Sequence, residues 1–464
     1  MKQNNILILP LVALIFAGSF FSCGEDRWSE YKERTALDVW IDSVMRINYL
    51  YYNEIPKSNR LNYFKSPATF LSSLLSSSDS YSFADSILDE PLATYGFDYS
   101  LTLNKESTAY DALITYVIPS SPADNAGLKR GEWIMKIDTT YITKSNASTL
   151  LGETNALKAT IGTYQQVINE DNDTTYEVVA DHVLNIGQAT SIADDPIHYH
   201  TILTLNDGSK VGYLMYNSFT AGTNTSPEKY NDEIRAISNT FSNAGIKSLI
   251  LDLRYNEGGS IACAQFLSTL LVPSNYLDET MATLRYNDLI AAERDTTLTF
   301  NSNLIGTGKN LDLSTLVFIT TGTTSGAGEM VMNCLNGKIN TMYTVGSTTA
   351  GQNVGTECIE NKAARWTINP VVCTVYNSSE STQSGGFKPT TSVVETTDYQ
   401  TYLPFGNTKE TLLSAAIDLL TNKKSQASNA TKNASSVKSS AKMHTIRSVR
   451  SANSRKFIGG LRVK

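Results

Sequence analysis

Two short strings in this sequence carry groups that could attack and polarise a carbonyl. Ser325 follows the apolar run 316–320 after a short polar turn, and it precedes a segment that we expect to be helical. A hydroxyl in this position is a candidate nucleophile if a base lies within reach. Gly258 and Gly259 follow a second apolar run, 250–253. Two adjacent glycines permit a sharp turn that leaves backbone N–H groups free to act as donors.

A base for Ser325 is harder to find. Nothing in the sequence places a histidine near it, although a Ser-His-Asp triad can form in any chain order. Lys338 lies 13 residues later, a spacing that does not fix its position. His198 and His200 could share one face of a strand, but no carboxylate or cysteine partner lies at a telling metal-site spacing. We therefore expect no metal and, without a phosphate loop or dinucleotide fingerprint, no cofactor.

The charge distribution argues against nucleic acid as a partner. Residues 421–464 carry 11 Lys and Arg and no acidic residue, which leaves 27 basic against 45 acidic residues in the remainder. An acidic body with a basic tail does not favour a polyanion as the partner of the folded part.

The first 23 residues resemble the signal peptide of a bacterial lipoprotein. Lys2 precedes the apolar run 6–21, which is shorter than the roughly 20 residues of a membrane span, and Cys23 follows a small residue at its end. This pattern predicts diacylation of Cys23 and a lipid anchor at the bacterial cell envelope. Ordinary signal cleavage, with Cys23 lost or left free, is the alternative. Further along the chain, Cys358 and Cys373 could form a disulfide or remain buried thiols.

Composition and periodicity divide the rest of the chain into four regions of a multidomain α/β protein. Residues 24–90 are predicted to be a helical N-terminal domain, and short β-prone runs between turn signals predict a β-rich domain over 91–185. Strands that alternate with helices over 190–420 predict an α/β core with parallel strands. Residues 421–464 lack an apolar period and are predicted to be disordered.

Residues 121–138, SPADNAGLKRGEWIMKID, resemble the signature of PDZ domains in bacterial proteases. Strict alternation in the strand of this string would put Trp133 and Ile137 on one face and Ile134 on the other. The resemblance implies a PDZ-like domain that binds a peptide C-terminus by strand addition. The residues that it assigns to the carboxylate-binding loop and the strand edge are Gly96, Phe97, Asp98 and Tyr99. A purely structural hairpin is the alternative.

Residues 250–259, ILDLRYNEGG, resemble the D-L-R-x-N-x-G-G motif of the C-terminal processing (tail-specific) serine peptidases. The resemblance implies a ClpP/crotonase-like peptidase core over 190–420, in which the amides of Gly258 and Gly259 belong to an oxyanion hole. It places Gly326 where the family carries its attacking serine, and Gln352 where the family carries its general-base lysine. Neither residue can perform the chemistry of a Ser-Lys dyad, because glycine has no side chain and an amide is not basic near neutral pH.

Two functions follow from the resemblance. The first is a peptidase homologue, with lost or altered proteolysis, that binds polypeptide C-termini or unfolded envelope proteins. The alternative is an active serine endopeptidase that uses Ser325 as a displaced nucleophile. One residue of slip on a helix turns a side chain by about 100°, which would direct Ser325 away from the base position.

Overall fold

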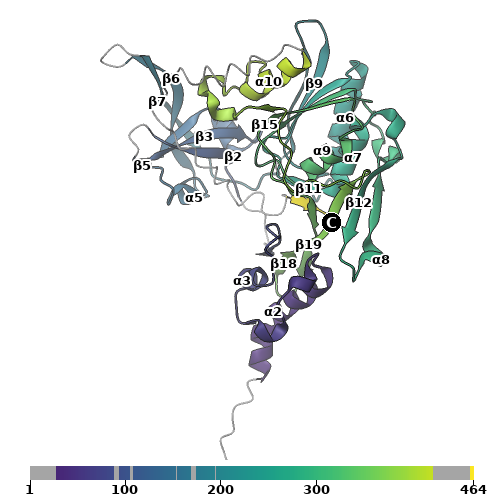
Figure 1. The fold of residues 1–464 in the computed structure, drawn as a ribbon. Coiled ribbons are helices and arrows are strands. Elements are labelled where there is room, and N and C mark those ends of the chain that lie inside the picture. The colour runs from purple at the N-terminus through teal and green to yellow at the C-terminus, as the bar shows by residue number, and fades with distance from the viewer. Residues whose placement is uncertain are drawn as a thin grey trace, which may run out of the picture.

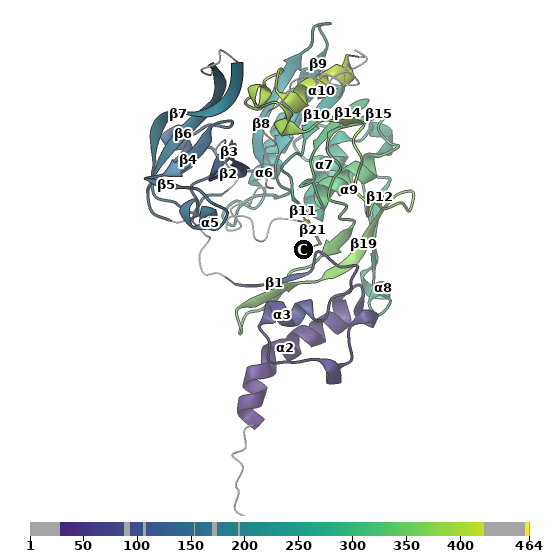
Figure 2. The same ribbon diagram turned by 60° about the vertical axis from the view of Figure 1, so that its left-hand side comes forward.

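The computed structural model describes residues 28–87, 93–104, 108–152, 154–168, 174–193, 195–421 and 460–463, so the predicted lipidation site Cys23 lies outside the described residues. The chain folds as a multidomain α/β protein with an N-terminal body, a β-rich body and a larger α/β core (Figures 1 and 2). Within the described ranges, no helix combines the length and the apolar character needed to cross a bilayer.

The N-terminal body contains the predicted helices and, in addition, a strand. Helix α2 spans Trp28–Asn48 and α3 spans Pro67–Ser72, and they pack through the buried side chains of Ile41, Met45 and Phe70. Strand β1 (Phe83–Ser86) pairs antiparallel with β18 (Trp366–Asn369), which also pairs with β17 (Ile359–Asn361). The region 24–90 that was predicted to be helical thus also contributes a strand, which completes a small sheet with residues of the core.

The β-rich body is a sheet that we call the PDZ-like sheet after its sequence resemblance. Its strand order is β2-β3-β4-β6-β7, with β5 (Thr140–Tyr141) paired to β4. Helix α4 (Pro122–Ala126) starts at the proline of the 121–138 string, with the Ser121 hydroxyl capping its first turn, and α5 (Ala147–Leu150) lies further on. The bounds of the five strands are Phe97–Leu103, Tyr110–Val117, Trp133–Ile137, Leu157–Ile168 and Thr174–Ile186.

A bulge interrupts the alternation that the sequence predicts for β4. The pairing of β4 with β6 shifts register between Ile134 and Lys136. Ile134 and Ile137 consequently share the core of the PDZ-like sheet, whereas Trp133 packs on the other side with Leu113 and Tyr402. The predicted grouping of Trp133 with Ile137 is wrong, because one extra residue in a bulge reverses the faces beyond it.

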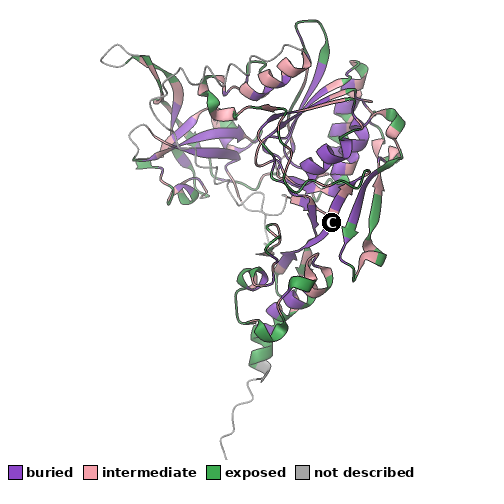
Figure 3. Cartoon of the chain, in the orientation of Figure 1, coloured by how far each residue is buried: buried purple, intermediate pink, exposed green. Residues whose placement is uncertain are grey.

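The core contains a largely parallel sheet with the order β20-β15-β14-β10-β9-β8, in which only β8 runs antiparallel to its neighbour. Helices α6 (Lys229–Asn243), α7 (Ile261–Leu271) and α9 (Ala327–Leu335) pack on one face, and α10 (Thr411–Leu420) packs on the other. Figure 3 shows α7 and α9 as largely buried elements. In that strand order the bounds are Thr391–Ser392, Thr341–Gly346, Thr315–Thr320, Ser248–Asp252, Lys210–Tyr216 and Ile197–Thr204.

A second core sheet has the order β11-β21-β16-β19-β12-β13 and covers the far side of α7 and α9. Its strand β21 is Gly460–Arg462, from the last residues of the chain (Figure 2). The prediction of disorder over 421–464 is therefore wrong for these residues, while 422–459 lie outside the described residues. Helix α8 (Ala291–Arg294) precedes β13, and the other strands span Gly258–Ser260, Val354–Thr356, Val371–Asn377, Thr280–Tyr286 and Thr296–Thr299.

The described cysteines are free thiols. Cys358 is exposed and Cys373 is buried, so the disulfide considered from the sequence is not formed.

Candidate active site

The turn between β14 and α9 carries the position where the family resemblance expects a nucleophile. Strand β14 is buried, and the chain leaves its end through a polar turn that reaches Gly326, the residue before α9. Gly326 has a φ of +53°, a conformation that side-chain-bearing residues rarely adopt. Its N–H donates to the Glu329 carboxylate (3.2 Å), which closes the first turn of the helix.

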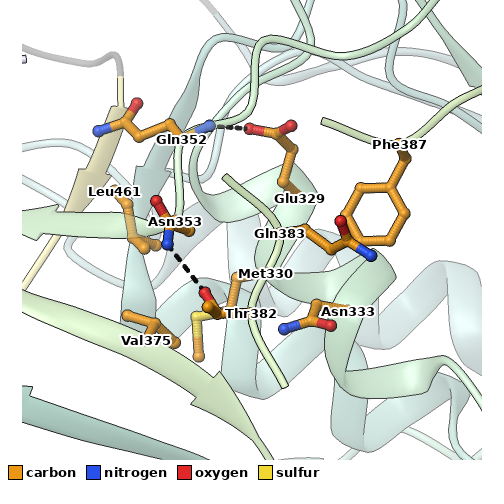
Figure 4. Close-up of a pocket in the computed structure, with 10 residues that line it drawn as sticks. All are labelled: Glu329, Met330, Asn333, Gln352, Asn353, Val375, Thr382, Gln383, Phe387 and Leu461. Carbon is orange, nitrogen blue, oxygen red and sulfur yellow. Dashed lines mark hydrogen bonds between the residues drawn. The ribbon is translucent and has the colours of Figure 1, made fainter. Parts of the chain in front are cut away.

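Glu329 also holds the position where the resemblance expects a base. Its buried carboxylate accepts hydrogen bonds from the N–H groups of Gly351 and Gln352 (2.7 Å each) and from the Thr349 hydroxyl. Figure 4 shows the bond from the Gln352 backbone, with the Gln352 side chain extending away from Glu329. Burial raises the pKa of Glu329, although these hydrogen bonds oppose the shift. One carboxylate therefore fixes both expected dyad positions through their backbones, a role that the sequence alone did not reveal.

The side chains at these positions point to backbone groups. Ser325 Oγ donates to the Glu257 carbonyl (2.7 Å), and Gln352 Nε2 donates to the Val354 carbonyl (3.3 Å). Ser325 is half-buried and Gln352 is buried. Among the described residues, no lysine or histidine side chain is hydrogen-bonded to Ser325. The hydroxyl is thus held by a carbonyl, which cannot accept its proton in a nucleophilic attack.

The glycine turn after β10 forms β11 and does not present both amides as free donors. Gly258 has a φ of +104° and Gly259 a φ of +137°. The Gly258 N–H donates to Asn256 Oδ1 (2.8 Å), and the Asn256 amide in turn donates to the Tyr216 carbonyl (2.9 Å). Gly259 pairs with Leu461 of β21. The expectation of a free amide at Gly258 is wrong, because the side chain two residues earlier occupies it.

A cavity of about 690 Å³ joins the PDZ-like sheet to these core positions. It brings Asp98 of β2 together with Ser325 and Gln352, and none of the described residues that line it is a lysine or a histidine. The contributing residues of the two bodies include Asp98, Ser100, Leu113, Thr115, Tyr255, Glu257, Ser325, Gln352, Glu395, Tyr402 and Gly460. A polypeptide that entered this cavity would contact both bodies.

The predicted carboxylate-binding loop of the PDZ-like sheet is packed closely. Gly96 has a φ of +83°, and a Cβ there would lie 2.1 Å from the Cβ of Ser121. Its N–H donates to the Thr94 hydroxyl (3.1 Å). Phe97 and Tyr99 are buried in the core of the sheet, and Asp98 is the member of the predicted set that lines the cavity. Peptide binding at this loop stays a prediction.

A buried charge cluster lies beside the cavity, at the end of β10. Arg254 is fully buried and forms ion pairs with Asp252, Glu395 and Glu410, each at 2.7 Å. Burial alone would lower the pKa of the Arg254 guanidinium, but the three carboxylates raise it well above its ordinary value. The sequence string 250–259 contains Asp252 and Arg254, but it gives no sign of the glutamates, which come from more than 130 residues further along the chain.

Arg130 of the β-rich body completes this cluster. It pairs with Glu395 (2.6 Å), donates to the Tyr255 hydroxyl (2.9 Å) and lies 3.9 Å from the centre of the Tyr402 ring. Burial would raise the pKa of Glu395, but Arg130 and Arg254 hold it below its ordinary value. The cluster therefore joins the β-rich body to the core next to the cavity.

Comparisons with known proteins agree with this architecture. The model of peptidase family S41 matches residues 210–393, and the model of the S41 N-terminal domain matches 36–83. The chain is 43% identical to a solved Bacteroides fragilis protein classed as an S41 protease, over 83% of this chain and 98% of that one, with a TM-score of 0.77. The photosystem II D1 C-terminal processing protease is 15% identical over 82% of this chain and 98% of its own, with a TM-score of 0.46. No curated protein matches the chain. The chain belongs to peptidase family S41.

Proposed function

We propose that this S41 family member binds polypeptide C-termini at the bacterial envelope and does not cleave them by a Ser-Lys dyad. The observation that carries the proposal is the pair Gly326 and Gln352 at the two positions that Glu329 holds together. Hydrolysis by this family chemistry needs a hydroxyl and a neutral amine in those places. The remaining hydroxyl, Ser325, donates to a backbone carbonyl, which supports binding over turnover.

The ligand class follows from the cavity and from the sequence resemblance. An extended peptide can add to a sheet edge through main-chain hydrogen bonds, and β2 is an edge strand of the PDZ-like sheet. Asp98 of that strand lines the same cavity as Ser325. A polypeptide C-terminus that pairs with β2 would therefore reach the core positions. Within this proposal, Cys23 is the lipidation site that keeps the protein at the envelope membrane.

The test uses the full-length chain in detergent with a labelled unfolded polypeptide that has either a free or an amidated C-terminus. We expect saturable binding that prefers the free carboxylate, and no fragments by mass spectrometry after prolonged incubation. Fragments that disappear in a Ser325→Ala form would overturn the proposal in favour of the displaced nucleophile. Equal binding of the free and amidated forms would contradict recognition of the C-terminus.

A further inference from the structure

Strand β21 occupies an inner position of the second core sheet, next to its edge strand β11. Strand β21 lies between β11 and β16 and runs parallel to both. The Gly460 N–H donates to the Glu257 carbonyl (2.5 Å), and the Val463 N–H donates to the Thr356 carbonyl (2.9 Å). Since β11 and β16 pair with β21 and not with each other, they form the two walls of a slot one strand wide. We call this the β11/β16 slot.

Side chains of strand β21 pack against the hydrophobic core next to the slot. Leu461 is 1% exposed and belongs to the main hydrophobic cluster, and Val463 packs against the same cluster. Burying a leucine side chain stabilises such a contact because apolar surface is removed from water. Figure 4 shows Leu461 beside Asn353, in the loop that carries Gln352. The segment is therefore held by the apolar side chains of Leu461 and Val463 in addition to its main-chain hydrogen bonds.

The glycine at the nucleophile position makes room for this strand. A Cβ on Gly326 would lie 2.1 Å from the Gly460 carbonyl oxygen, and a Cβ on Gly258 would lie 1.8 Å from the same atom. A Cβ on Gly460 would lie 3.1 Å from Gln352 Nε2. A serine at 326 and the strand in its present place therefore exclude each other. A side chain at position 326 and strand β21 would occupy the same space, so the glycine is needed for the strand to lie where it does.

The burial of strand β21 also has an unfavourable contribution, from a polar group of Arg462. Arg462 is half-buried, and its Nε has no hydrogen-bond partner among the described residues. Burying a polar group without a partner is unfavourable, and this cost offsets part of the gain from burying Leu461. Gly460, at the other end of the strand, lines the 690 Å³ cavity. The first residue of β21 therefore borders the space where a foreign polypeptide would enter.

We infer that the β11/β16 slot is a peptide-binding site whose resident ligand is the chain's own C-terminal segment, residues 460–463, bound in cis. A foreign C-terminus enters the slot only by replacing that segment. The ligand chemistry is a parallel strand with a glycine beside Gly326 and a branched apolar residue in the next position. This inference deepens the proposed function, because it rests on the same cavity and names the competitor that any ligand must displace.

The test uses the full-length chain, a Leu461→Asp form and a matched Leu289→Asp form, in which an exposed leucine (56%) receives the same change. The probe is a fluorescent peptide with the sequence of residues 456–464, KFIGGLRVK. A tethered ligand acts at an effective concentration of up to about millimolar. We therefore expect the Leu461→Asp form to bind the probe at least about tenfold more tightly than the other two. Equal binding by all three forms, or no binding by any, would overturn the inference.

Hydrogen exchange of the unchanged chain keeps the inference testable if Leu461→Asp does not fold. The amides of β21 are expected to exchange by local opening, faster than the amides of the central strands β10 and β14. Equal protection of β21, β10 and β14 would identify the segment as an ordinary structural strand and overturn the inference. A concentration-dependent dimer that Leu461→Asp abolishes would show that the occupant comes from a second copy, which contradicts binding in cis.

The same forms separate this inference from the proposed function. Tight binding of the KFIGGLRVK probe without binding of foreign C-termini would support the slot and overturn the general function. Binding of foreign C-termini that is unchanged by Leu461→Asp would support the function and overturn the slot.

Discussion

The charge cluster around Arg254 and the glycine-lined positions around Gly326 lie beside one cavity, but they are built in different ways. In the cluster, side chains from both bodies meet, and the guanidinium of Arg254 has three carboxylate partners. Around Gly326 the contacts are made by the backbone, because Gly258 and Gly326 both pack against Gly460. The first region depends on charges that must all be present. The second depends on the absence of side chains.

This difference shows that the architecture around the cavity depends on two separate sets of contacts. Glu329 still joins the helix start to the loop of Gln352 through backbone N–H groups, so the frame does not need a serine or a lysine. The charge cluster holds the two bodies around the cavity independently of that frame. The two regions share no side chain, so a change in one leaves the side-chain contacts of the other in place.

Removing the hub of the cluster is expected to have the largest effect. Arg254→Met leaves Asp252, Glu395 and Glu410 buried without their main partner, and breaking such a pair costs about 3–5 kcal/mol. Urea denaturation would measure the loss. The matched control is Arg285→Met, at a guanidinium that is 51% exposed, where we expect a change of about 1 kcal/mol or less. Similar losses for both changes would show that burial of the cluster contributes nothing.

The carboxyl of Asp111 is buried and, within the described part of the chain, is not paired with a guanidinium, in contrast to that of Glu395. Burial raises its pKa to about 7. Because the folded-state pKa exceeds that of the unfolded chain, the contribution of Asp111 to stability is greatest below about pH 4 and falls as the pH rises to about 7, by up to about 4 kcal/mol. We expect Asp111→Asn to remove this decline and to raise stability above pH 7. Thermal denaturation between pH 4 and pH 8 tests it. An unchanged pH profile in the variant would assign the decline to other groups.

Much of the fold could be predicted from local sequence patterns. The contacts that complete the charge cluster and the region around Gly326 could not. The strings 121–138 and 250–259 identify the PDZ-like sheet and the turn after β10. Their glycines are required by local turns, and their apolar residues by the buried strands beside those turns. Glu410 pairs with both Arg254 and Arg130 only through tertiary packing, and no spacing in the sequence connects these residues. A bulge of one residue in β4 was likewise invisible, although it decides which face Ile137 occupies.

The tail is the clearest case of a local pattern that misleads. Residues 421–464 have the composition of a chain that cannot form its own core. Residues 460–462 form a strand nevertheless, because β11 and β16 supply both ladders and the core supplies the pocket for Leu461. Its strand structure comes from the receiving site, which composition cannot show. The glycine at position 326 and the glutamine at position 352 were visible in the sequence, but the packing of Gly326 against Gly460 was not.

A methyl group at the nucleophile position is expected to have an intermediate effect. Gly326→Ala puts a Cβ on a residue with positive φ and against the Gly460 carbonyl. The backbone strain alone costs about 1–3 kcal/mol, and the clash with β21 adds to it. In a form that lacks residues 460–464 the clash is absent, so the cost of Gly326→Ala should fall.

The control for this change is Gly328→Ala, two residues further along, in the first turn of α9. A Cβ there meets its nearest atom at 3.5 Å, an ordinary contact, and we expect a neutral or stabilising effect of up to about 1 kcal/mol. If the cost of Gly326→Ala is the same with and without the tail, the two are not coupled in the way that their geometry indicates.

Ser325→Ala is expected to have the smallest effect. The hydroxyl gives one hydrogen bond to the Glu257 carbonyl, and its loss costs about 1 kcal/mol. The matched control is Ser72→Ala, which removes an exposed hydroxyl bond to a helix carbonyl and should cost less. The Glu257 carbonyl also accepts from the Gly460 N–H, so it keeps a partner while the tail is in place. The cost of Ser325→Ala should therefore rise when residues 460–464 are removed. Equal costs in both backgrounds would mean that the serine and the tail do not share this acceptor, and the backbone-built region would then be less cooperative than the charge cluster beside it.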